Sequence, residues 1–213
     1  MRPIIEFDAL TDLEQYVSAF PEATTEAARI ALNDVSDGEG LAVYRKAIES
    51  EIDYPEGYIT TDRLGVTTKA TNSKLAVTIT GRQRATSLAR FARGGQTVAS
   101  TRRAGVRVKV SKQGGGGRME RAWLVRLNKG SSKDRDNYNL GLAIRLEPGE
   151  RLRNKREVRS VQLDQNVYLL YGPSIDQVFR DVAITETPPV LDKIGNEFFR
   201  QFFRIVGSKR RGR

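Results

Sequence analysis

One alternating segment near the middle of the chain constrains the fold more than any other feature. From Val106 to Ser111, valine occupies every second position, and Arg107 and Lys109 stand between the valines. Successive side chains of a β-strand point to opposite faces of its sheet, so this period predicts a half-buried strand. One face of that strand is expected to be apolar and the other cationic.

Turn residues separate this segment from further strand patterns. We predict that the glycines at 114–117 turn the strand and that residues 122–127 return as its antiparallel partner. The stretch from 82 to 95 is expected to be an extended polar loop that Leu88 and Phe91 anchor. Three more strands are predicted at residues 75–80, 140–146 and 161–171.

The chain before these strands has helical periodicity. A short helix is expected to end at Pro21, and a longer amphipathic helix is expected from about residue 22 to about residue 51. Gly38 and Gly40 lie in its middle, where glycine costs about 1 kcal/mol relative to alanine. Either the helix bends at these glycines, or small residues are needed there for close packing.

The end of the chain is also predicted to be helical. Ser174 is expected to cap one helix, and Thr187, followed by two prolines, is typical of the start of a second helix, which Gly207 ends. An apolar stripe on the second helix comprises Leu191, Ile194, Phe198, Phe202 and Ile205. Part of this stripe is available to contact another subunit.

These patterns together predict an α+β fold. We expect an antiparallel β-sheet core with a long N-terminal helix, C-terminal helices and an extended basic loop. The chain has 213 residues, a length that fits a single domain. Within it, residues 1–58 form the helical N-terminal part, residues 82–118 the extended basic loop and first hairpin strand, and residues 208–213 a basic tail.

Charge is distributed unevenly along the chain. Residues 1–81 contain 7 Lys and Arg against 14 Asp and Glu, whereas residues 82–160 contain 21 against 6. A strongly basic middle predicts contact with a polyanion or with an acidic protein surface. Alternatively, the acidic region of one copy meets the basic region of the next.

The basic residues have no pattern of a sequence-specific DNA reader. The sequence contains no helix-turn-helix, zinc finger or basic zipper, and aromatic residues are not interleaved with the charges as single-strand binders require. The basic side chains therefore face a protein partner, DNA phosphates or solvent. The candidates are Arg82, Arg84, Arg90, Arg93, Arg102, Arg103, Arg107, Lys109, Arg153, Lys155, Arg156, Lys209, Arg210 and Arg211.

No catalytic, cofactor-binding or metal-binding residue is expected. The chain has neither histidine nor cysteine, which removes the commonest general base and the thiol nucleophile. The glycines at 114–117 lack the Lys-Ser/Thr of a phosphate loop. The acidic cluster of Glu49, Glu51, Asp53 and Glu56 is expected to face solvent or a neighbouring subunit. No apolar run approaches the ~20 residues of a membrane span, so no membrane partner is expected.

Three stretches of this sequence together resemble the prophage minor tail protein Z family. The run from Gly172 to Phe179 is similar to the family's Gly-Pro-Ser-x-x-Gln-hydrophobic-Phe motif through Gly172, Pro173, Ser174, Gln177 and Phe179. Residues 85–91 resemble a Ser-Leu-x-Arg-Phe segment of the family. The third likeness is the order of the strand at 106–110, the glycines and the strand at 122–127.

The resemblance implies a structural role in a bacteriophage tail. Such a protein would lie in the virion at or near the head-proximal end of the tail, where it helps to complete the tail or join it to the head after assembly in the host cytoplasm. The resemblance implies a homo-oligomeric ring around the DNA channel, expected to be hexameric, with other tail and neck proteins as partners and non-specific contact with genomic DNA. The alternative is a nucleic-acid-binding module that does not read sequence.

Overall fold

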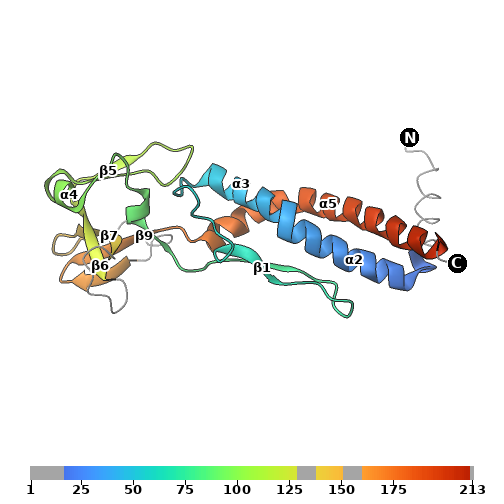
Figure 1. Cartoon of the computed structure of the whole chain (residues 1–213). Helices are drawn as coiled ribbons and strands as arrows, with labels where there is room; N and C mark the ends of the chain where they lie inside the picture. The colour runs from blue at the N-terminus through green and yellow to red at the C-terminus, as the bar shows by residue number, and fades with distance from the viewer. Residues whose placement is uncertain (1–16, 129–137, 151–159, 212–213) are drawn as a thin grey trace, which may run out of the picture. The chain divides into compact units, whose positions relative to one another are not determined.

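A computed structural model describes residues 17–128, 138–150 and 160–211, and it has the predicted α+β class (Figure 1). Helices lie at the beginning and end of the chain, and antiparallel strands lie between them. The elements are α2 (Pro21–Val35), the π-helical turn η1 (Ser36–Gly40), α3 (Leu41–Glu51), β1 (Leu64–Thr68), β2 (Thr78–Gly81), β3 (Thr86–Ser87), the 3-10 turn η2 (Leu88–Phe91), α4 (Val98–Ala104), β4 (Val106–Val108), β5 (Gly117–Met119), β6 (Ala122–Asn128), β7 (Tyr138–Arg145), β8 (Ser160–Asp164), β9 (Val167–Gly172) and α5 (Ile175–Arg211).

The chain divides into two compact units. The helical unit consists of Met1–Val43, Gly65–Thr80 and Thr185–Arg213, and the sheet unit consists of Tyr44–Leu64 and Gly81–Ile184. Both units contain separate stretches of chain, so neither is continuous in sequence.

The predicted N-terminal helix is confirmed, and it contains an irregular turn. Helix α2 continues through η1 into α3, so the helix spans Pro21 to Glu51. The two glycines lie in η1, and π-helical turns often mark irregular packing within a helix. A Cβ on Gly40 would lie 3.3 Å from Val190 Cγ1 of α5, whereas one on Gly38 would meet nothing. Close packing therefore explains Gly40 only. Most of the short helix expected before Pro21 lies outside the described residues.

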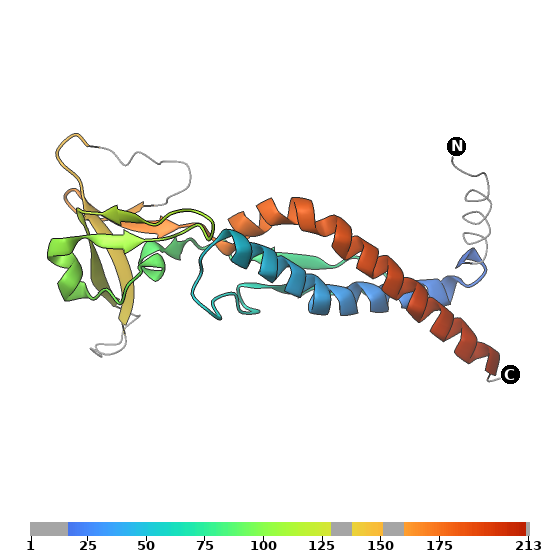
Figure 2. The same cartoon turned by 90° about the horizontal axis from the view of Figure 1, so that it is seen from above.

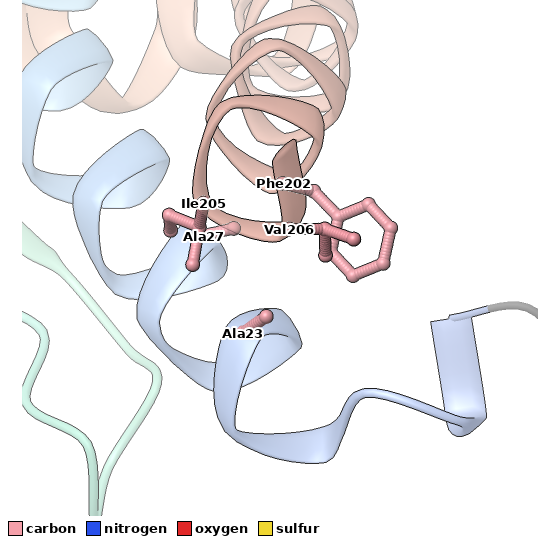
Figure 3. Close-up of a cluster of buried hydrophobic side chains, with 5 residues drawn as sticks. All are labelled: Ala23, Ala27, Phe202, Ile205 and Val206. Atoms are coloured by element: carbon pink, nitrogen blue, oxygen red, sulfur yellow. The ribbon is translucent and has the colours of Figure 1, made fainter. Parts of the chain in front are cut away.

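The core of the helical unit forms between α2 and α5. In Figures 1 and 2 these helices run alongside each other, and Figure 3 shows Ala23 and Ala27 of α2 facing Phe202, Ile205 and Val206 of α5. The small alanines leave room for the fully buried Phe202 ring. The prediction of a buried apolar stripe is therefore confirmed for Phe202 and Ile205.

Helix α5 departs from the prediction in three ways. One continuous helix replaces the two expected helices, Pro188 and Pro189 lie inside it, and it runs past Gly207 to Arg211. Proline removes a helical hydrogen bond, yet the helix continues through both residues, and Val182 and Val190 on either side of them are buried. Leu191 was expected on the buried stripe, but it is 57% exposed because Val190 occupies the inward position.

Strands β1 and β2 form a separate two-stranded sheet. The strand expected at 75–80 begins only at Thr78, and Leu75 is 45% exposed. The sequence analysis did not predict β1. In the helical unit, the Asn33 side chain of α2 donates to the Ala70 carbonyl at 3.0 Å and accepts from its amide at 2.8 Å. These two bonds hold the loop after β1 against the helix.

The sheet unit contains a five-stranded antiparallel sheet. Its order is β3-β9-β7-β6, and β8 pairs with β9. The strand expected at 140–146 is confirmed as β7. The prediction of a single strand at 161–171 is wrong, because this segment forms a hairpin of β8 and β9. The turn of the hairpin contains Asn166, whose φ is positive at 58°. Asparagine tolerates this left-handed conformation better than most residues do.

The predicted pairing of the strand at 106–110 with residues 122–127 is wrong, because β4 pairs with β5 in a separate hairpin. The glycines at 114–116 lie in the loop between the two strands, as predicted, but Gly117 begins the returning strand, Gly117–Met119. Residues 122–128 pair instead with β7. Two residues of turn after Met119 redirect the chain into the larger sheet. Val106 and Val108 are buried and Arg107 is exposed, as the alternation predicts.

The segment from 82 to 118 is more regular than the loop that the sequence analysis predicted. It contains β3, η2, α4 and β4. Leu88 and Phe91 are buried, so their prediction as anchors is confirmed. The buried Thr101 hydroxyl of α4 accepts a hydrogen bond from the Leu124 amide of β6 at 3.0 Å, which ties this short helix to the sheet.

Candidate anion-binding surface

The structure separates the predicted basic residues into different settings. Arg82 and Arg90 surround a tyrosine, Arg93, Arg107 and Lys109 line one hollow, and Arg102 lines another. Arg84 and Arg103 are exposed. Outside the described residues lie Arg153, Lys155 and Arg156, together with the side chains of Lys209, Arg210 and Arg211.

A basic hollow lies at the β4–β5 hairpin of the sheet unit. Its volume is about 390 Å³, and its lining contains four cationic side chains and no acidic one. The lining residues are Arg93, Arg107, Val108, Lys109, Gly116, Gly117 and Arg118. The two glycines contribute only backbone to the lining, which keeps that side of the hollow free of side chains.

The register of three neighbouring segments places three arginines in a line, which we call the arginine row. Arg107 of β4 lies directly opposite Arg118 of β5. On the other side of β4, the bridge between Ala92 and Val108 puts Arg93 opposite Arg107, and the Arg93 amide donates to the Arg107 carbonyl at 3.0 Å. Directly opposed residues have their side chains on the same face, and neighbouring strands are about 4.8 Å apart.

Side-chain hydrogen bonds hold Arg107 in this register. The Gln96 side chain accepts from the Arg107 amide and donates to the Arg107 carbonyl, both at 2.9 Å. The Gln96 side chain thereby forms the two backbone hydrogen bonds with Arg107 that a neighbouring strand would otherwise form. The capping box of Thr97 and Ser100 then starts α4.

Two of the three arginines already have partners within the chain. The Arg93 guanidinium forms an ion pair with Asp53 and donates to the Asp53 carbonyl at 3.2 Å. Arg118 Nε donates to the Ala104 carbonyl at the end of α4 at 2.8 Å. Within the described part of the chain, the side chains of Arg107 and Lys109 have no hydrogen bond or ion pair. These two cations are therefore free to bind an anion.

The predicted acidic cluster is divided by these contacts. Asp53 is only 13% exposed and binds Arg93, and its other carboxylate oxygen lies 3.7 Å from Lys112 Nζ. Backbone bonds between Asp53 and Val110 and between Lys112 and Glu51 bring these segments together. Glu49, Glu51 and Glu56 are exposed. The contribution of Asp53 to a contact between subunits stays a prediction, and its carboxylate already has cationic partners in its own chain.

A second group of arginines surrounds Tyr58 in the sheet unit. The guanidinium carbon of Arg63 lies 4.0 Å from the centre of the ring, and those of Arg90 and Arg82 lie at 5.3 and 5.8 Å. Arg82 also donates to the Tyr58 hydroxyl at 2.8 Å. Contacts of this kind between cations and aromatic rings stabilise the fold. Arg82 and Arg90 thus stabilise the fold through their contacts with Tyr58.

The tyrosine beside this group has a perturbed acidity. Tyr54 stacks on Tyr58 with ring centres 5.2 Å apart, and its hydroxyl donates to the Pro173 carbonyl at 3.2 Å. Burial, together with the neighbouring Tyr58, raises the pKa of Tyr54 well above its usual value of 10.0. The Tyr54 phenol is therefore neutral in the folded protein over the physiological pH range.

A second hollow, with a volume of about 470 Å³, has mixed charge. Three arginines line it together with two glutamates, Trp123 and Ala122; the arginines are Arg102, Arg121 and Arg145. Arg121 forms a two-pronged ion pair with Glu150. Because carboxylates already balance its arginines, this hollow is a weaker candidate for anion binding than the one at the arginine row.

The run from Gly172 to Phe179 forms the joint between β9 and α5. The Ser174 hydroxyl accepts from the Gln177 amide at 3.1 Å, and the Gln177 side chain accepts from the Ser174 amide at 2.9 Å. This reciprocal capping box confirms Ser174 as the helix cap. A Cβ on Gly172 would lie 2.9 Å from the Phe91 ring, and the Phe179 ring packs edge-on against Tyr44 with centres 5.1 Å apart. Each of these residues therefore has a packing or capping role.

The sequence analysis missed Arg118 as a site residue. Its place in the arginine row depends on the pairing of β4 with β5, and the sequence analysis paired β4 with residues 122–127 instead. The signal that could have found it is the run of glycines, because a hairpin strand often pairs with the residues that directly follow the connecting loop, here residues 109–116. Arg63 was missed for a similar reason, since only the tertiary structure brings it to Tyr58.

Searches of the described ranges for other kinds of site were negative. Over residues 17–128, 138–150 and 160–211, no three or more acidic side chains are grouped as metal ligands would be. None of the helices in these ranges has the length and hydropathy needed to cross a bilayer. In comparisons with known proteins, no family model, no curated protein sequence and no solved structure matches this chain.

Proposed function

We propose that this chain is a structural protein of a bacteriophage tail, at or near its head-proximal end. The observation that carries the proposal is the run from Gly172 to Phe179, which resembles the motif of the prophage minor tail protein Z family. In this chain the run joins β9 to α5 through a reciprocal capping box. A joint of that kind gives a physical reason why these residue types occur together at this spacing.

The proposed assembly is a homo-oligomeric ring around the DNA channel, with six copies as the expected number. Large apolar side chains on the surface of α5 support contacts between subunits: Ile184 is 81% exposed and Phe203 is 54% exposed. The exposed Glu49, Glu51 and Glu56 provide negative charge for the basic region of a neighbouring copy. Other tail and neck proteins would complete the contacts in the virion.

Two measurements test this proposal: the mass of the purified protein in solution and antibody labelling of phage particles. The purified full chain is expected to form rings of defined mass by light scattering and electron microscopy, and antibodies against it are expected to label one end of the tail in phage particles. Association through charge is expected to weaken toward about 1 M salt, where the screening length is about 3 Å. A chain that stays monomeric at all concentrations and labels no particle would contradict the proposal.

The arginine row favours a second candidate function, a nucleic-acid-binding module that does not read sequence. The three arginines of the row and the nearby Lys109 line one hollow, without an acidic residue in the lining. Affinity for duplex DNA is then expected to fall with salt, with a slope near 0.9 for each phosphate contacted. Tight binding by the isolated monomer favours this function, whereas ring formation with little DNA affinity favours the tail protein.

A further inference from the structure

We infer that the arginine row, together with Lys109, binds a ligand that carries two or more linked phosphates. This inference does not depend on the tail assignment, because it rests on the register and charge of the β4–β5 hairpin. The ligand class is defined by its phosphates, which either belong to a small polyphosphate or form part of a nucleic-acid backbone.

Electrostatic repulsion between the arginines of the row destabilises the protein when no anion is bound. Like charges directly opposite each other on neighbouring strands are destabilising, and Arg107 and Arg118 occupy such a position. Arg93, on the other side of Arg107, adds a third charge to the line. An anion that bridges the row removes this repulsion, so part of its binding energy comes from strain already present in the free protein.

The two cations without a partner in the described chain, Arg107 and Lys109, lie close together at the hollow. Arg107 and Lys109 are two positions apart in sequence, and both line the hollow. Asp53 neutralises only the Arg93 end, and the Ala104 carbonyl holds the Arg118 guanidinium beside the hollow. The site is therefore built around an unneutralised Arg107, with one positioned arginine on each side.

The length of the arginine row and the geometry of its guanidinium groups favour linked phosphates over a carboxylate. The row extends over two strand spacings, roughly 10 Å, which is longer than a single carboxylate can bridge. A phosphate group offers more acceptor oxygens, and its geometry matches the planar guanidinium fork. The backbone of Gly116 and Gly117 leaves that side of the hollow without side chains, and its volume of about 390 Å³ accommodates a ligand of this size.

Calorimetry on the full chain tests the inference with three probes at constant ionic strength. The probes are inorganic pyrophosphate, a short DNA duplex and citrate, which carries carboxylates only. We expect pyrophosphate or the duplex to bind more tightly than citrate. If pyrophosphate binds and the duplex does not compete, the ligand is a small polyphosphate; if the duplex binds and pyrophosphate displaces it only weakly, the ligand is a nucleic-acid backbone.

Matched variants separate the site from general surface charge. Arg107→Gln is expected to weaken binding of the phosphate probe on the order of tenfold, because it removes the central charge-assisted bond. Lys109→Gln is expected to weaken it by a smaller factor. The controls Arg84→Gln and Arg103→Gln change the net charge equally at exposed positions outside the row, and at most about twofold loss is expected from screened charges.

Three results would overturn the inference. They are the absence of binding by both phosphate probes, binding of citrate as tight as that of pyrophosphate, and equal losses in the row and control variants. Because the Arg107 side chain makes no bond within the described chain, Arg107→Gln is expected to fold, and thermal unfolding checks this. Backbone amide shifts at Gly116 and Gly117 on adding the probe give a second readout in the unmodified protein.

Discussion

Arg107 and Arg118 lie directly opposite each other across the antiparallel pair of β4 and β5. Sheets generally avoid like charges at this position because the two side chains lie on the same face. Here the Gln96 side chain and the neighbouring Arg93 amide hold the Arg107 backbone in place. The hairpin therefore keeps a repulsive pair that a partner anion can relieve.

Removing one charge of this pair should stabilise the free protein. We expect Arg107→Thr to raise the free energy of unfolding by about 0.2–1 kcal/mol at low salt, since it removes the repulsion and threonine favours strands. Denaturant unfolding measures this, and Arg103→Thr on the exposed face of α4 is the control for net charge. A destabilised Arg107→Thr protein would show that the opposed arginines are not repulsive.

The capping box at the start of α5 should make a measurable contribution to stability. Ser174→Ala removes the hydroxyl that accepts from the Gln177 amide, so we expect a loss of about 1 kcal/mol in the free energy of unfolding. Ser18→Ala, at an exposed position, is expected to have little effect. Equal stability of the two variants would contradict a capping role for Ser174.

Two adjacent phenylalanines of α5 should respond very differently to substitution. Phe202 is fully buried against α2, so Phe202→Ala is expected to cost about 3–5 kcal/mol of stability. Phe203→Ala, at a largely exposed position, is expected to cost less than about 1 kcal/mol. Thermal or denaturant unfolding compares the two variants directly.

The same pair tests the proposed assembly. If exposed apolar side chains of α5 contact neighbouring subunits, Phe203→Ala should lower the mass of the oligomer at a given concentration while the subunit remains folded. Light scattering measures this mass. An unchanged oligomer would exclude Phe203 from the subunit contact.

Alkaline pH should destabilise the protein through Tyr54. Its pKa is raised in the folded state, so the stabilisation is complete below about pH 10, the usual value for an unfolded tyrosine. Above that pH the unfolded chain releases the proton and the folded chain retains it. The free energy of unfolding therefore falls as pH rises.

Tyr54→Phe tests this alkaline effect. The variant should show a shallower decline above about pH 10. At neutral pH it should lose about 0.5–1.5 kcal/mol, because it lacks the hydrogen bond to the Pro173 carbonyl. Unfolding measured across this pH range gives both quantities, and Tyr168→Phe serves as the comparison variant. An equally steep decline in the Tyr54→Phe protein would assign the pH dependence to other groups.

Gly105 should tolerate no side chain. Its φ is 72° and its ψ is −176°, and an added Cβ would lie 2.6 Å from the Met119 carbonyl oxygen. We expect Gly105→Ala to destabilise the protein by about 1–3 kcal/mol, since only glycine adopts this conformation readily. Gly115→Ala, where an added Cβ meets nothing, is the control. Equal unfolding midpoints for the two variants would contradict this explanation.

Local patterns predicted the local structure well. The alternation of valines with Arg107 and Lys109 predicted a strand with one buried and one cationic face, which is confirmed over Val106–Val108 only. The helix from about 22 to 51 and the cap at Ser174 are confirmed. These features depend on residues a few positions apart, because the periods of helix and strand decide which side chains share a face.

Non-local features were predicted poorly. Two successive prolines predicted a new helix, but α5 is continuous through them, with Val182 and Val190 buried on either side. The predicted strand at 161–171 contains a turn around Asn166, and the polar residues Asp164, Gln165 and Asn166 were a local signal for it that the strand assignment overlooked. At the prolines, the tertiary context outweighed a local preference of a few kcal/mol at most.

The sequence by itself determined the helix over about 22–51, the short strand at Val106–Val108, the residue at which α5 begins, and that the middle of the chain is strongly basic. Only the tertiary structure decided that β4 pairs with β5, and therefore that Arg93, Arg107 and Arg118 form one row while Arg82 and Arg90 surround Tyr58. The physical reason is that strand pairing joins residues distant in sequence, so many alternative pairings satisfy the same local pattern. The contacts of the folded chain select one of them.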